Sequence, residues 1–219
     1  MENIEPSKEQ LERKARSIAI LEKQEVPYID HLPVIERECE INARSKEEVA
    51  LRALCLLVVG LKGEELEQKI IDKIVKDKGL KESFTDKEKA FLWGGQNTKQ
   101  DYVNATWRYE AAWVLLWALG YVDDLGRPED MCDVPMAVTL MKDLDQEKFI
   151  SSAKLQPISK ILDQADLIYR YHWAVVNACV NGKEPPTKLD VSVVLERHYA
   201  FNWLTGYMEQ DWDDMSTDT

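Results

Sequence analysis

The spacing of apolar residues along the chain predicts helices throughout. In most stretches apolar residues recur every three or four positions, and no stretch shows the strict apolar–polar alternation of a half-buried strand. Capping residues, glycines and prolines separate the helical stretches. The helices predicted in this way cover residues 7–23, 45–60, 64–78, 85–93, 98–120, 134–141, 158–180 and 190–205.

The stretch from Tyr102 to Tyr121 is predicted to be the central helix of the core. It contains three tryptophans, and from Ala111 onward it is apolar on every side of a helical wheel. A helix of that kind is buried in a protein core or in a membrane. The apolar run ends at Val122 after about a dozen residues, whereas a membrane span needs roughly 20. We therefore expect a core helix, with Gly120 as its left-handed cap.

The domain organisation follows from the start and stop signals. Ser45 with Glu48, and Thr85 with Glu88, have the spacing of a capping box, which marks a helix N-terminus. No internal repeat and no long linker divides the chain. We predict one all-α domain over residues 1–206. Residues 207–219 are acidic, and we expect them to form a flexible tail.

Charge narrows the classes of partner. The chain has 28 basic and 40 acidic residues, a net charge of −12. This balance argues against nucleic acid and anionic membranes as partners, because phosphate groups are bound by clustered Lys and Arg. It is compatible with a basic protein partner. The polar N-terminus shows no apolar signal segment, so we expect a cytoplasmic protein. The many aromatic residues make a homo-oligomer conceivable without deciding it.

Metal and cofactor signatures are weak. The acidic loop at residues 123–133 offers carboxylates to a divalent cation but lacks the spacing of an EF-hand, so we expect a solvated loop. The four cysteines are far apart in the sequence, and we expect them to be free, buried thiols. The sequence contains neither a phosphate-binding glycine motif nor a GxSxG motif. We predict no cofactor and no metal.

Glu110 is the most informative charge in the sequence. It shares a helix face with Trp107 and Trp117, so its carboxylate is expected to lie out of water. A buried charge is costly without a partner. We hypothesise that Glu110 meets either Arg170 or Arg197, each of which lies on another strongly apolar helix. Arg108 is also expected to be drawn inward.

Further polar side chains interrupt the apolar faces of the last two long helices. His172 and His198 lie on apolar stripes, and neither has a metal-ligating residue three or four positions away, so hydrogen-bonded core histidines are favoured over a metal site. Glu196 and Arg197 fall within apolar surroundings. The candidate polar pocket therefore comprises Glu110, Arg170, His172, Glu196, Arg197 and His198.

Several segments together resemble a known family. They are RKARSIAILEKQEVPYIDHLP near the start, SKEEVALRALCLL, WRYEAAWVLLWALG, and LDQADLIYRYHWAVVNA followed by VVLERHYAFNWLTG. In this order they resemble the mainly bacterial family called domain of unknown function 4272, from about Arg13 to Leu204. The resemblance implies a helical, cytoplasmic, bacterial protein. It implies no activity and no catalytic residue.

Two functional hypotheses follow. The first is a non-enzymatic protein-interaction or regulatory module, favoured by the acidic surface and the lack of a catalytic motif. The alternative is a small-molecule-binding protein or an enzyme that uses the candidate polar pocket. A closed core with paired charges would favour the first hypothesis, and an open cleft in which those side chains converge would favour the second.

Overall fold

The computed structural model describes residues 5–219, and over this range it contains helices and no strand. The first four residues of the polar N-terminus, on which the expected absence of a signal segment partly rests, lie outside the described residues. The α-helices are α1 (Lys8–Lys23), α2 (Lys46–Gly63), α3 (Gln68–Asp77), α4 (Asp86–Trp93), α5 (Lys99–Ala118), α6 (Val134–Asp143), α7 (Gln146–Ser152), α8 (Ile158–Val180) and α9 (Val191–Thr205). The predicted all-α fold is confirmed.

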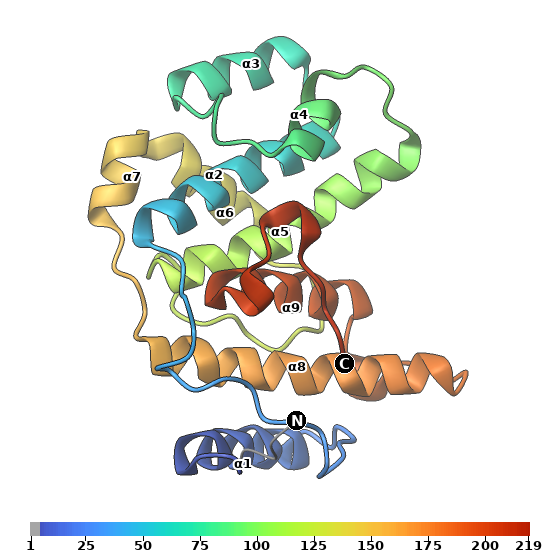
Figure 1. Cartoon of the computed structure of the whole chain (residues 1–219). Coiled ribbons are helices and arrows are strands. Elements are labelled where there is room, and N and C mark those ends of the chain that lie inside the picture. Colours follow the sequence, from blue (N-terminus) through green and yellow to red (C-terminus); the bar gives the residue numbers. More distant parts are fainter. Residues whose placement is uncertain (1–4) are drawn as a thin grey trace.

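The long helices form a layered stack (Figure 1). α2 packs most extensively on α5, α5 packs on α9, α9 on α8, and α8 on α1. The shorter helices α3, α4, α6 and α7 surround the α2 end of this stack. The order of layers therefore differs from the order along the chain, and α1 lies at the far end of the stack from α2.

α5 is the central helix, as the sequence predicts. Thr98 and Asp101 form a capping box at its start, and every residue from Tyr109 to Ala118 is buried. Gly120 adopts a positive φ of 76°, which ends the helix. The carbonyls of Ala118 and Leu119 accept hydrogen bonds from the backbone at residues 156 and 154, both at 2.8 Å. The carbonyl groups at the buried C-terminus of α5 are thus hydrogen-bonded to the chain segment that leads into α8.

α2 is a second helix that is buried over most of its length. Its residues from Val49 to Leu61 are all buried except Leu51. Close approach to α5 depends on glycine: a Cβ atom at Gly60 would lie 2.6 Å from the ring of Tyr109, and one at Gly63 would lie 2.8 Å from the backbone N of Thr106. Small residues at these positions let the two helix backbones come together.

One helix starts later than predicted, and one helix was not predicted. The helix expected at residue 64 begins at Gln68, because Glu65 has a positive φ of 60° and the chain turns there. α7 was not predicted. It is only seven residues long, and its start depends on Asp145, whose side chain accepts a hydrogen bond from the backbone N of Lys148. Too few apolar residues lie in so short a helix to show a period.

The expected flexible tail is instead packed against the core. Trp212 is 5% exposed and Met215 is 7% exposed. The indole of Trp212 makes edge-to-face contacts with Tyr199 and Trp203, with ring centroids 5.0 and 5.4 Å apart. The hydroxyl of Tyr199 donates to the carbonyl of Trp212. The acidic composition predicted disorder, and the burial of one large aromatic side chain outweighs it.

Candidate functional site

Glu110 forms an ion pair with Arg197 between α5 and α9. Arg197 Nε donates to Glu110 Oε2 at 3.0 Å, and the two side chains are 4% and 0% exposed. The second carboxylate oxygen accepts from the backbone N of Cys132, and Arg197 Nη1 donates to the carbonyl of Gly126 at 2.8 Å. Of the two partners considered for Glu110, the structure selects Arg197. Both carboxylate oxygens of Glu110 therefore have hydrogen-bond donors.

Arg108 and Glu196 form a second ion pair across the same two helices. Arg108 Nη1 donates to both oxygens of Glu196, at 3.0 and 3.2 Å. The guanidinium also lies over the ring of Tyr199, with Arg108 Cζ 5.3 Å from the ring centroid. Burial raises the pKa of Glu196, and the charge of Arg108 opposes that rise. This pair is nearer the surface, since Arg108 is 30% exposed.

His172 of α8 and His198 of α9 are hydrogen-bonded to each other. Their Nδ1 atoms are 2.8 Å apart, and both rings are buried. One Nδ1 must carry the proton and the other must accept it. Burial lowers the pKa of His172 to about 4, and burial together with His172 lowers the pKa of His198 to about 3. The pair is therefore neutral at pH 7, as expected for core histidines.

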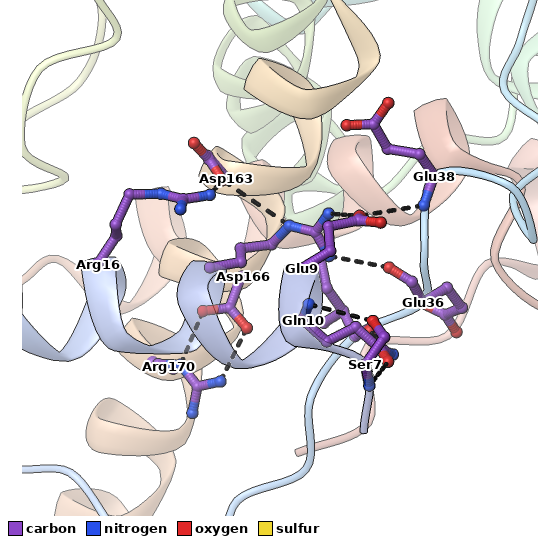
Figure 2. Close-up of polar contacts among 11 residues, drawn as sticks. Ser7, Glu9, Gln10, Arg16, Glu36, Glu38, Asp163, Asp166 and Arg170 are labelled. Carbon is purple, nitrogen blue, oxygen red and sulfur yellow. Dashed lines mark hydrogen bonds and ion pairs between the residues drawn. The ribbon is translucent and has the colours of Figure 1, made fainter. Parts of the chain in front are cut away.

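Arg170 pairs within its own helix. It donates to both oxygens of Asp166, at 2.7 and 2.8 Å, and both side chains are 1% exposed. The i,i+4 spacing of this pair is visible in the sequence, but its burial is not. Figure 2 shows the pair facing α1, beside the contacts that Asp163 makes with that helix.

Arg13 is the polar residue of this interface that the sequence analysis missed. It is 1% exposed, although it lies in a helix with many solvated charges. It donates to the carbonyl of Glu36 at 2.9 Å and to Glu9, and its Nε lies 3.7 Å from Asp163. Within residues 5–219, Arg13 Nε and Arg170 Nη1 are buried with no hydrogen-bond partner. The α1–α8 interface is thus rich in cations and incompletely satisfied.

Arg197 also lines a small cavity. The cavity holds about 210 Å³ and lies among α1, α8, α9 and residues 124–128. Arg127, Tyr171 and Gln24 line it as well. Arg127 forms an ion pair with Glu129, and its Nη2 donates to the carbonyl of Thr187 at 2.6 Å. His198 lines a different cavity, between α8, α9 and residues 33–36. The six candidate residues are therefore divided among separate pairs and do not converge in one pocket.

The described residues contain no group of three or more His, Cys, Asp or Glu side chains placed to hold a metal ion. In the acidic loop, Asp124 accepts a hydrogen bond from the backbone N of Gly126 at 3.2 Å, which is an ordinary turn contact. Cys55 is buried as expected, but Cys39 and Cys179 are exposed. Cys179 lies at the C-terminal end of α8. Over residues 5–219 no helix is both long and apolar enough to cross a membrane.

The arrangement has a clear chemical character. Glu110, Arg170 and Arg197 are each bound to an opposite charge and are at most 4% exposed, while the two histidines are neutral and hydrogen-bonded to each other. General acid–base catalysis needs a titrating group that reaches a substrate proton. In this structure Glu110 and Asp166 each bind an arginine instead.

Neither a curated protein nor a solved structure matches the chain. A family model does, over residues 13–215, and this includes the C-terminal segment that packs on α9. The chain belongs to the family described as domain of unknown function DUF4272.

Proposed function

We propose that this protein is a non-enzymatic interaction or regulatory module of a bacterial cytoplasm, and that it acts by binding a basic protein. The observation that carries the proposal is the state of the candidate charges. Glu110–Arg197 and Asp166–Arg170 are complete buried ion pairs, which leaves neither carboxylate available as an acid or base.

The charge of the protein supports the kind of partner. The net charge is −12, and the charges sealed in the core cancel in pairs, so the excess negative charge lies on the surface. A surface of one sign attracts a partner of the opposite sign and speeds their encounter.

The test is affinity purification of the tagged chain from its native cytoplasm at moderate salt. The expected result is one basic protein retained near stoichiometrically and released as salt rises, because charge attraction is screened. Recovery of the chain alone, with the same result after chemical cross-linking, would contradict the proposal.

A second candidate, a small-molecule-binding protein, is favoured by the cavity beside Arg197. Two guanidinium groups, Arg127 and Arg197, line it together with the hydroxyl-bearing Tyr171. Such a lining suits a small carboxylate ligand. A screen of carboxylic acids by thermal shift tests it: a stabilising hit that is lost in Arg127→Gln would favour this candidate over the first.

A further inference from the structure

The C-terminal segment lies between two hollows of the surface. The first holds about 250 Å³ and lies among α4, α5, α9 and Trp212. The second holds about 660 Å³ and lies among the start of α2, residues 82–86 and residues 211–214. Trp212 and Asp213 line both hollows, and we call the two together the Trp212 cleft. Its carboxylates are Glu48, Glu82, Asp86, Glu88, Asp101, Asp211, Asp213 and Asp214.

The cleft has more negative than positive charge, and its cations are already engaged. Eight carboxylates face four basic side chains. Each of these four already donates within the chain. Arg44 donates to the carbonyls of Trp203 and Gln210, and Arg52 donates to Glu88. Lys87 donates to the carbonyl of Asp213, and Arg108 donates to Glu196. Four of the eight carboxylates make no hydrogen bond or ion pair within residues 5–219 and are left for a cation from outside the chain: Glu82, Asp86, Asp211 and Asp214.

Glu88 lines the first hollow and, within residues 5–219, has one carboxylate oxygen without a donor. It is 7% exposed, and its Oε2 accepts from Arg52 Nη2 at 2.8 Å and from the backbone N of Thr85 at 2.9 Å. Its Oε1 has no hydrogen-bond partner in the described part of the chain. A buried acceptor left without a donor costs free energy, which a donor supplied by a ligand would recover.

The aromatic wall of the cleft already accommodates a guanidinium. Arg52 Cζ lies 5.5 Å from the ring centroid of Trp212, and Arg44 Cζ lies 5.1 Å from that of Trp203. Aromatic rings attract such cations, and aromatic side chains are common anchors of protein interfaces. The cleft thus combines carboxylates, which can pair with a basic side chain, and tryptophan rings, on which such a side chain can stack.

We propose that the Trp212 cleft binds a basic segment of a partner protein, with one arginine or lysine side chain donating to Glu88 Oε1. The proposal rests on the function proposed above and names its binding surface. The second hollow takes the neighbouring residues of the segment, whose positive charges lie against the exposed carboxylates of Asp211 and Asp214.

The test uses the full chain and a defined probe. The probe is a fluorescein-labelled nonapeptide that alternates arginine and glycine, and its matched control carries citrulline in place of arginine, which keeps the shape and removes the charge. Binding is followed by fluorescence anisotropy in 0.15 M salt, a condition that screens diffuse attraction.

Two triple variants separate the cleft from general acidity. Glu82→Gln/Asp211→Asn/Asp214→Asn neutralises exposed cleft carboxylates that make no hydrogen bond within residues 5–219. Asp143→Asn/Glu147→Gln/Glu184→Gln makes the same change of charge at exposed positions outside the cleft. We expect saturable 1:1 binding that is weakened about tenfold by the cleft variant, as three exposed charge pairs would give, and less than twofold by the other variant.

Glu88→Gln, which removes the charge of the buried carboxylate, is expected to weaken binding further in a variant whose folding is checked by circular dichroism. Equal weakening by the two triple variants would overturn the cleft while leaving the proposed function standing. Equal affinity for the arginine and citrulline peptides, or binding of neither, would overturn the cleft and the basic partner together.

Discussion

The α2–α5 interface and the α1–α8 interface lie at different levels of the same stack (Figure 1) and are built from different materials. Between α2 and α5, Gly60 and Gly63 bring the backbones close together. Between α1 and α8, contact is made through Arg13, Arg16 and Asp163. One interface depends on the shape of apolar surfaces, and the other on the pairing of charges.

The difference teaches how each interface fails. A close apolar contact has no spare volume, so an added atom disrupts it and salt does not. A polar contact tolerates changes of shape. Removal of one partner, however, leaves the other charge buried without compensation, which costs free energy. The predictions below distinguish these two modes.

The largest effect is expected from Asp166→Ala. It leaves Arg170 buried without its carboxylate, and the loss of one partner of a buried pair costs about 3–5 kcal/mol of the free energy of unfolding. Urea denaturation followed by circular dichroism measures the loss. The double variant Asp166→Leu/Arg170→Met removes both charges and should recover most of it. A loss below about 1 kcal/mol in the single variant would show that Arg170 finds another partner.

The next largest effect is expected from a change of pH, because the contribution of the histidine pair at the α8–α9 interface to the free energy of unfolding depends on pH. The folded pKa values, about 4 for His172 and about 3 for His198, lie below the unfolded value of 6.5. The unfolded chain therefore binds protons more tightly, so the contribution of the pair to stability is complete above about pH 6.5 and is lost progressively as pH falls toward 3. Between pH 7 and 5 we expect a loss of about 4 kcal/mol from the two histidines together, measured by denaturation at each pH. His172→Gln/His198→Gln should flatten this slope, and an unchanged slope would assign the acid sensitivity to other groups.

Gly63→Ala tests the close apolar contact. The new methyl group would lie 2.8 Å from the backbone N of Thr106, which cannot move away as a flexible side chain does. We expect a loss of about 2 kcal/mol that is the same at low and high salt. Glu47→Ala, at an exposed position of the same helix, is the control and should change stability by less than about 0.5 kcal/mol. A Gly63→Ala variant as stable as the parent would mean that α2 and α5 can separate without cost.

The smallest effect is expected from Arg16→Ala. Arg16 donates to Asp163 at 2.6 Å, but its side chain is 54% exposed. An exposed pair contributes about 0.2–1 kcal/mol, and salt should abolish this contribution. Thermal denaturation at 0.05 and 1 M salt compares the two conditions. A difference between variant and parent that persists at high salt would place Arg16 in the packing of α1, not in its charge pairing.

Much of the fold was predictable, because the local signals agree with one another. The capping boxes predicted at Ser45 and Thr85 mark true helix starts, and the apolar run after Ala111 is buried as its composition requires. The partner of Glu110 was narrowed to two arginines, since a charge on an apolar stripe must be neutralised by another such charge.

The parts that could not be predicted depend on contacts between distant segments. Arg13 lies in a helix whose alternating charges are typical of a solvated face, and only the docking of residues 36–38 and α8 buries it. Trp212 stands alone among acidic residues, so no period reveals that it packs on Trp203. In both cases the local pattern is correct and the tertiary contact overrides it.

The position of α1 at the end of the stack has a consequence for motion. α8 is the helix on which α1 packs extensively, and polar contacts to residues 30–38 complete its attachment. Such an outer layer can detach as a unit while the core remains folded. Amide hydrogen exchange of α1 would then proceed by local opening, faster than that of α5, and the protein would behave as a stable core with one detachable helix.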